Sequence, residues 1–155
     1  GRLSLEKNQK RLIESFSRLP SIDNFRLGIM GSGALCSDLL KMIDQNGLNN
    51  KVKIFPARSN PFPFISRGNC FVLSSDHEGQ GLVLFEAMAL GLPVISTDIP
   101  GPRSVIQDGA GILAEPSSDA LRDAMLSLSK ENLNIKKFDF EKYNSDIMNK
   151  INKFF

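Results

Sequence analysis

The sequence predicts an α/β fold in which a parallel sheet is covered by helices on both faces. Short apolar segments flanked by Gly, Pro or Asn, which are typical of strands, alternate along the chain with longer segments of helical periodicity. Strands connected through helices form βαβ units, and such units build parallel sheets. The 155 residues, 41% of them hydrophobic, are enough for one domain with a single core.

The individual elements follow from the same periodicities. Strands are expected at residues 25–30, 52–55, 70–73, 93–96 and 111–113. Helices are expected at residues 7–19, 35–46, 82–90 and 118–130, and from about residue 140. Leu39, Leu40 and Ile43 would lie on the apolar face of the second helix. The third helix, almost wholly apolar, would be buried and would end at Gly91, and Ser118 would cap the fourth.

Composition and charge exclude several classes of protein. No run approaches the ~20 apolar residues of a membrane span, and the N-terminus lacks a signal-peptide pattern, so a cytoplasmic protein is expected. The net charge of +2 does not predict nucleic acid binding. Cys36 and Cys70 are expected to be buried free thiols, and with one histidine, His77, no structural zinc site is expected. Because the chain opens with Gly1 and soon reaches an amphipathic segment, we expect a piece of a longer protein.

A Gly-Ser-Gly turn at residues 31–33 lies between a predicted strand and a predicted helix, where parallel sheets bind ligands. A dinucleotide-binding fingerprint would need a glycine in place of Cys36 and an acid about 20 residues further on, where Lys51 and Lys53 stand. Nicotinamide binding is therefore not predicted. The turn would allow a close backbone approach either of a ligand or of the packed sheet.

Residues 74–81 precede the apolar helix and contain polar side chains and two glycines. Because N–H groups at a helix N-terminus attract anions, phosphate or sugar oxygens are the expected ligands there. Glu86 lies about one turn inside the apolar helix, and a buried carboxylate needs hydrogen-bond donors. A polyhydroxylated ligand would supply donors to Glu78 and Glu86 together. Alternatively, Glu86 caps a neighbouring loop or pairs with an arginine.

The seven residues between Glu78 and Glu86 give a spacing that resembles the E-x7-E motif of family 4 glycosyltransferases. These are retaining enzymes of the GT-B fold, which has two Rossmann-like domains. The resemblance covers roughly residues 1–130, and further motifs follow in the family's order. They are Gly1-Arg2-Leu3-Ser4 with Lys7, Met30-Gly31-Ser32-Gly33, Ala87-Met88-Ala89-Leu90-Gly91-Leu92-Pro93-Val94-Ile95, Thr97-Asp98 and Gly101-Pro102-Arg103. The resemblance implies one half of a GT-B fold, a Rossmann-like doubly wound parallel sheet.

The resemblance also implies a role for each matching residue. Arg2 and Lys7 would neutralise the diphosphate of a nucleotide sugar. Glu86 would hold the ribose hydroxyls and Glu78 would lie against the donor sugar, so Glu78, Arg2 and Lys7 are the catalytic candidates. Further contacts to the nucleotide sugar would come from Gly31, Gly79, Gln80, Gly81 and Leu82, and from Ala57 and Arg58 at the base.

No metal or other cofactor is expected, because enzymes of this family stabilise the departing diphosphate with fixed cations in place of Mg²⁺. The nearest approximations to Asp-x-Asp, at residues 76–78 and 139–141, are not expected to hold a metal. In the family an acidic residue often follows the glycine that matches Gly101, whereas Pro102 and Arg103 follow it here. Arg103 would be either an additional phosphate ligand or a solvated base.

We expect residues 1–137 to form the nucleotide-sugar-binding domain. Residues 138–155 would form a basic amphipathic helix that packs on this domain or on a missing N-terminal, acceptor-binding domain, a membrane surface being the alternative partner. The predicted function is the donor domain of a retaining, metal-independent hexosyltransferase that uses a UDP- or GDP-hexose. The acceptor would be a hydroxyl of a glycan or lipid-linked glycan, in the cytoplasm or at the inner face of the membrane.

Two other functions remain open: a noncatalytic nucleotide-binding module, and a sugar-nucleotide epimerase or phosphorylase of the same architecture. A phosphorylase would need a lysine for pyridoxal phosphate inside the core, and no lysine of the predicted sheet region is placed for it. As half of an enzyme, the chain is expected to bind nucleotide with little or no turnover.

Overall fold

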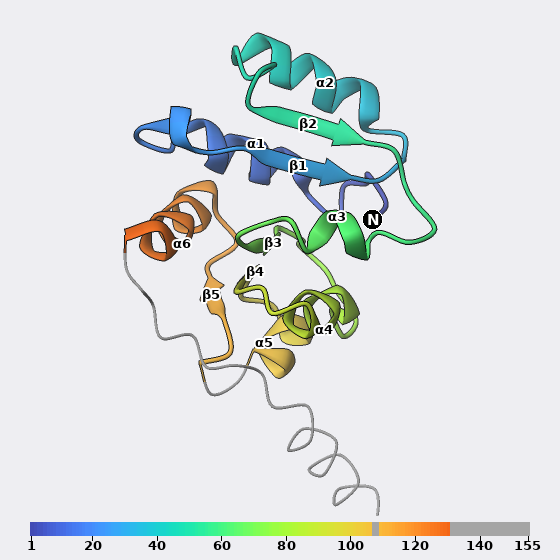
Figure 1. Cartoon of the computed structure of the whole chain (residues 1–155), viewed down its shortest axis with the longest axis vertical. Helices are drawn as coiled ribbons and strands as arrows, with labels where there is room; N and C mark the ends of the chain where they lie inside the picture. The colour runs from blue at the N-terminus through green and yellow to red at the C-terminus, as the bar shows by residue number, and fades with distance from the viewer. Residues whose placement is uncertain (107–108, 131–155) are drawn as a thin grey trace, which may run out of the picture.

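The computed structural model describes residues 1–106 and 109–130. The predicted helix from about residue 140, and with it the separate segment 138–155, lies outside the described residues. In chain order the elements are α1 (Gln9–Ser17), the 3-10 helix η1 (Ile22–Asn24), β1 (Leu27–Met30), α2 (Cys36–Gln45), β2 (Val52–Phe55), α3 (Phe62–Ile65), β3 (Phe71–Leu73), α4 (Leu82–Ala89), β4 (Val94–Thr97), α5 (Pro100–Val105), β5 (Ile112–Ala114) and α6 (Ser118–Lys130) (Figure 1).

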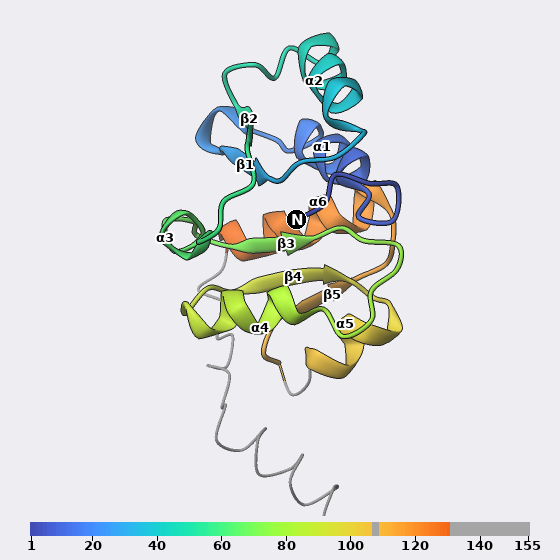
Figure 2. The ribbon, with the colours of Figure 1, turned by 90° about the vertical axis from the view of Figure 1, so that its right-hand side faces the viewer.

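The described strands pair in parallel throughout, which confirms the predicted class of fold. They lie in two sheets, one of β1 and β2 and one in the order β3-β4-β5. The N-terminus lies between β1 and β3 (Figure 2). There Arg2 forms an isolated parallel bridge with Ser32, and the Leu3 N–H donates to the Ser32 carbonyl at 2.9 Å. The first residues of the chain are thus held alongside the turn that follows β1.

Helices cover both faces of the three-stranded sheet. All four residues of β4 are buried. Val94 packs with Leu84 and Met88 of α4, whereas the next residue, Ile95, packs with Leu121 of α6. Because neighbouring residues of a strand point to opposite faces, α4 and α6 lie on opposite sides of β4. This arrangement confirms the doubly covered parallel sheet expected from the sequence.

A second core lies between the two-stranded sheet and helices α1 and α2. It joins Ile13 of α1, Leu39 and Ile43 of α2, Ile29 of β1 and Val52 of β2. The apolar face predicted for α2 is only partly right, since Leu40 is 50% exposed. Among residues 1–106 and 109–130, none of the helices has the length and hydropathy of a membrane-spanning segment.

Several local expectations differ from the structure. Ser117, not Ser118, caps α6, because its Oγ accepts the Ala120 N–H at 3.1 Å while the Ser118 hydroxyl donates to Glu14. The short helices α3 and α5 were not expected, since four and six residues show too little periodicity to be recognised. Helix α4 does end before Gly91, whose φ of 78° suits glycine, but it is buried on one face only, because Leu82 is 64% exposed.

Candidate functional site

The loop after β3 is bound to the segment that leads into α1. The Ser74 hydroxyl donates to the Lys7 carbonyl at 3.0 Å, and the Asp76 N–H donates to the Glu6 carbonyl at 2.8 Å. These residues stand almost seventy positions apart in the sequence. The structure therefore brings together the two segments that the sequence proposed for the diphosphate and for the donor sugar.

Asn8, Arg11 and Asp76 strengthen this junction. Arg11 Nη2 lies 2.6 Å from Asp76 Oδ1, and Asn8 Nδ2 donates to Asp76 Oδ2 at 2.7 Å. Asn8 also caps α1 through its side-chain oxygen, in a left-handed conformation (φ 42°) that asparagine tolerates well. The sequence did not single out Asn8 or Arg11, because no short spacing relates them to Asp76.

Glu78 is held by two donors in a nearly closed environment. Its Oε1 accepts from Lys7 Nζ and from Ser75 Oγ, each at 2.6 Å. The Glu78 side chain is 9% exposed and that of Lys7 34%. A carboxylate removed from water needs such partners, and contacts with a charged donor are the stronger ones. Two residues proposed to bind adjoining parts of one ligand are thus already in contact.

Glu86 does not occupy the buried position expected from its apolar neighbours. It lies on the exposed side of α4, and its side chain makes no hydrogen bond or ion pair with any described residue. Neither a capped loop nor an arginine partner is therefore found for it among residues 1–106 and 109–130.

The entrance to α4 is open to an anion. Gly79 and Gln80 are exposed, Gly81 is buried with a left-handed φ of 68°, and Leu82 begins the helix. No side chain caps this N-terminus. Uncapped N–H groups and the positive end of the helix dipole are the features by which helices bind phosphate.

Arg2 and Arg103 present their charges differently. The Arg2 side chain is exposed and makes no hydrogen bond or ion pair with a described residue, while its carbonyl accepts from Gln9 Nε2 at 2.9 Å. Arg103 Nε donates to Asp98 Oδ1 at 2.6 Å, and this bond raises the pKa of Arg103. Of the two, the Arg2 guanidinium is the one without a partner in the described part of the chain. The loop residue His77 is exposed.

The glycines of the turn after β1 allow a close approach of protein backbone. A Cβ on Gly31 would collide with the Gly1 carbonyl oxygen, and a Cβ on Gly33 with the Leu3 carbonyl oxygen. The structure therefore shows backbone of residues 1–3 packed closely against the turn. Gly31 is buried.

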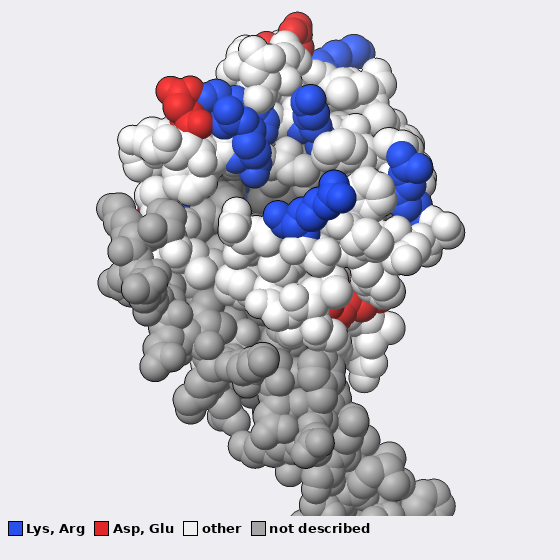
Figure 3. All heavy atoms as spheres, viewed as in Figure 1, with Lys and Arg blue, Asp and Glu red and all other residues white. Residues whose placement is uncertain are grey.

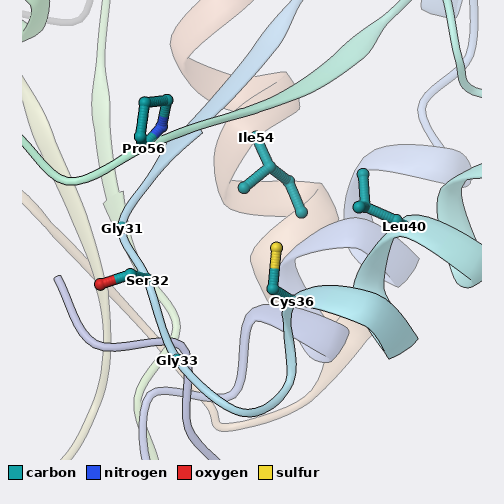
Figure 4. Close-up of a pocket in the computed structure, with 7 residues that line it drawn as sticks. All are labelled: Gly31, Ser32, Gly33, Cys36, Leu40, Ile54 and Pro56. Carbon is teal, nitrogen blue, oxygen red and sulfur yellow. The ribbon is translucent and has the colours of Figure 1, made fainter.

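A cavity of about 430 Å³ adjoins this turn. Figure 4 shows the side chains of Cys36, Leu40 and Ile54 converging between β2 and the first turns of α2, with Pro56 at one side. The expected base-contact residues Ala57 and Arg58 follow Pro56 and are exposed. The other lining residues are Gly31, Ser32 and Gly33. The cavity is mostly apolar, and the structure brings neither Ala57 nor Arg58 into its wall.

Positive charge predominates around β2 and α3. Residues 45–75 contain four Lys and Arg and no acidic residue. Figure 3 shows Lys and Arg side chains around a hollow over this part of the molecule. The Arg58 guanidinium also lies 5.5 Å from the centroid of the Phe64 ring, a cation–π contact. Such a surface raises the local concentration of anionic ligands.

The remaining candidates for chemistry among the described residues are metal-binding clusters and the two free thiols. Residues 1–106 and 109–130 contain no cluster of three or more His, Cys, Asp or Glu placed to hold a metal. The free thiols of Cys36 and Cys70 are each half-buried, and burial raises the pKa of Cys70 to about 12. Cys70 is therefore protonated at neutral pH and a poor nucleophile.

Gly101 sets the position of the Glu78 loop. A Cβ at Gly101 would collide with the Gly79 carbonyl oxygen and lie 2.7 Å from that of Glu78. We expect Gly101→Ala to lower the free energy of unfolding by about 1–3 kcal/mol, the usual effect of overpacking. Gly79→Ala is the matched control, because a Cβ there meets nothing within 4 Å. Urea denaturation of both variants measures the difference, and equal stabilities would show that the loop yields without strain.

Comparison with known proteins gives consistent matches. A family model for group 1 glycosyl transferases matches residues 1–146. An uncharacterized glycosyltransferase of Methanocaldococcus jannaschii is 43% identical over 108 residues, 68% of this chain and 27% of that protein. The lipopolysaccharide core biosynthesis glycosyltransferase LpsE of Rhizobium meliloti is 33% identical over 120 residues, 77% of this chain and 34% of that protein.

The fold also matches that of a solved structure with bound UDP. A crystal structure of an S. aureus TarM variant, in complex with UDP among other ligands, aligns with a TM-score of 0.81 and 28% identity. The match covers 88% of this chain and 29% of the TarM chain. The chain thus spans about a third or less of the length of these relatives.

Proposed function

The chain belongs to the group 1 glycosyl transferases, and from this membership we propose that it is the donor-binding half of such an enzyme. The observation that carries the proposal is the contact between Lys7 Nζ and Glu78 Oε1 at 2.6 Å. It places a cation suited to a diphosphate directly beside a carboxylate suited to a sugar hydroxyl. The uncapped N-terminus of α4 follows three residues after Glu78.

The proposed ligand is a nucleoside diphosphate hexose with UDP or GDP as the nucleotide. Arg2, Lys7 and the N-terminus of α4 would bind the diphosphate, and the exposed carboxylate of Glu86 would bind the ribose hydroxyls. Glu78 would contact the hexose. The UDP in the TarM structure supports a uridine nucleotide. Ala57 and Arg58 would lie near the base.

The proposed reaction is retaining transfer of the hexose to an acceptor hydroxyl. Fixed cations would stabilise the diphosphate as it leaves, which is electrostatic catalysis by preorganised charge. The acceptor would be bound by an N-terminal domain, and the name of LpsE supports a glycan or lipid-linked glycan as acceptor. Work on such an acceptor would place the enzyme at the inner face of the membrane.

Binding and transfer are proposed to need no divalent metal. We expect added EDTA to change the UDP dissociation constant of the chain less than about twofold, because Lys7 and Arg2 would replace Mg²⁺ at the diphosphate. Titration calorimetry of UDP in the presence of EDTA and in the presence of excess MgCl₂ measures this. A strict requirement for Mg²⁺ would contradict the proposal.

A thermal-shift screen tests the function as a whole. The chain is expected to be stabilised by a UDP- or GDP-hexose, with ADP- and CDP-sugars as comparison ligands. A ligand at about 100 times its dissociation constant adds about 2.7 kcal/mol to the free energy of unfolding, which a melting curve resolves easily. Failure of every nucleotide sugar to raise the melting temperature would overturn the assignment.

A further inference from the structure

Ser75 is a buried hydroxyl directed at the site. It lies in the loop after β3 and has 0% exposed area. Its Oγ donates to Glu78 Oε1 at 2.6 Å, a short hydrogen bond to a charged acceptor. A serine three residues before a glutamate is common in sequences, so the spacing alone carried no signal.

The backbone of Ser75 is fixed from the neighbouring strand. Thr97, the last residue of β4, is also fully buried, and its Oγ1 donates to the Ser75 carbonyl at 2.6 Å. Two buried hydroxyls thus act in series, Thr97 on the Ser75 backbone and Ser75 on the Glu78 carboxylate. Because both are packed, Ser75 Oγ has little freedom to move away from Glu78.

The two oxygens of the Glu78 carboxylate have different surroundings. Oε1 accepts from Ser75 and from Lys7, whereas no described residue donates to Oε2. Rotating the carboxylate would break both bonds to Oε1, so the group is held in one orientation. Oε2 is the oxygen left for a hydroxyl of a ligand.

We propose that Ser75 is a positioning residue, which holds Glu78 so that Oε2 accepts a hydrogen bond from a hydroxyl of the donor hexose. This inference rests on the proposed function and names a residue that acts through Glu78. Binding of the nucleotide moiety does not depend on the hydrogen bond between Ser75 and Glu78. The effect of losing Ser75 therefore falls on recognition of the hexose and not on recognition of the nucleotide.

The test compares UDP-glucose with UDP by titration calorimetry on the whole chain. In Ser75→Ala the ratio of the UDP-glucose to the UDP dissociation constant is expected to rise about fivefold over the wild type, the value of one hydrogen bond. UDP affinity itself should change less than about twofold. Ser96→Ala is the matched control, because Ser96 is equally buried and its hydroxyl donates to the backbone carbonyl of Thr97.

A double mutant separates positioning from a general structural effect. In Glu78→Ala the ratio should rise as well, and adding Ser75→Ala should raise it no further, because there is no carboxylate left to orient. Thr97→Val keeps the Ser75 hydroxyl but frees the Ser75 backbone, so it should raise the ratio less than Ser75→Ala does. It replaces Ser75→Ala as the test variant if Ser75→Ala does not fold.

Three results overturn the inference. They are an unchanged ratio in Ser75→Ala, an equal rise in Ser96→Ala, and additive effects in the double mutant. If the wild-type chain binds neither UDP nor UDP-glucose, the proposed function fails and the role of Ser75 with it. The wild-type titration reveals that case before any variant is compared.

Discussion

Replacing Glu86 with alanine is expected to weaken UDP binding about 100-fold while leaving the stability of the chain unchanged. Two hydrogen bonds from ribose hydroxyls to a carboxylate contribute about 3 kcal/mol together when each is worth about 1.5 kcal/mol, and a 100-fold loss of affinity corresponds to about 2.7 kcal/mol. The Glu86 side chain is exposed and has no hydrogen-bond or ion-pair partner among the described residues, so its removal leaves no protein group unpaired. Titration calorimetry measures the affinity, and thermal denaturation measures the stability.

Glu115→Ala is the matched control for Glu86, since Glu115 is also an exposed glutamate whose side chain makes no bond to a described residue. It should bind UDP like the wild type. If Glu86→Ala bound UDP with wild-type affinity, Glu86 would not be the residue that binds the ribose. A large loss of stability in that variant would instead point to a structural role for the carboxylate.

Replacing Lys7 with alanine is expected to weaken UDP binding about 30- to 100-fold, but UMP binding only a few-fold. Lys7 is the charged partner of Glu78, whose side chain is 9% exposed, and it is also a proposed ligand of the diphosphate. The substitution therefore removes a diphosphate ligand and leaves Ser75 as the one described residue that donates to the Glu78 carboxylate. The uncompensated negative charge then also repels the phosphates. The selectivity for the diphosphate arises because UMP lacks the second phosphate that the lysine would reach.

Lys10→Ala is the matched control for Lys7, because Lys10 is an exposed lysine of α1 with no ion pair among the described residues. Its loss should change UDP affinity less than about twofold, as expected for a screened surface charge. Arg2→Ala should resemble Lys7→Ala but with a smaller effect on stability, since the Arg2 guanidinium has no partner in the described part of the chain. Equal losses of UDP and UMP affinity in Lys7→Ala would argue against a diphosphate contact.

The class of fold could be predicted because it depends on patterns within short segments. The strands at β2 and β4 and the helix α6 follow from apolar runs and helical periodicity, and these are decided locally. The cap of α6 could not be predicted, since Ser117 and Ser118 are equivalent by composition and only the path of the chain makes Ser117 the cap. The division of the strands into two sheets could not be predicted, because pairing partners are distant in sequence.

The candidate site was predicted as a set of residues but not as a network. Lys7 and Glu78 follow from the motifs, yet nothing in the sequence indicates that they form an ion pair 71 positions apart. Asn8 and Arg11, which bind Asp76, were missed for the same reason. The burial of Glu86 was predicted wrongly, because the apolar composition of α4 hides the fact that one side of this helix is exposed.

The measurement that tests the account most directly is a crystal structure of the chain with UDP bound. The account predicts the ribose hydroxyls at hydrogen-bond distance from Glu86, about 2.6–3.2 Å. The diphosphate should lie against Lys7 and the N-terminus of α4. UDP bound elsewhere, such as in the cavity between β2 and α2, with Glu86 and Lys7 free of contact, would contradict the proposed donor site.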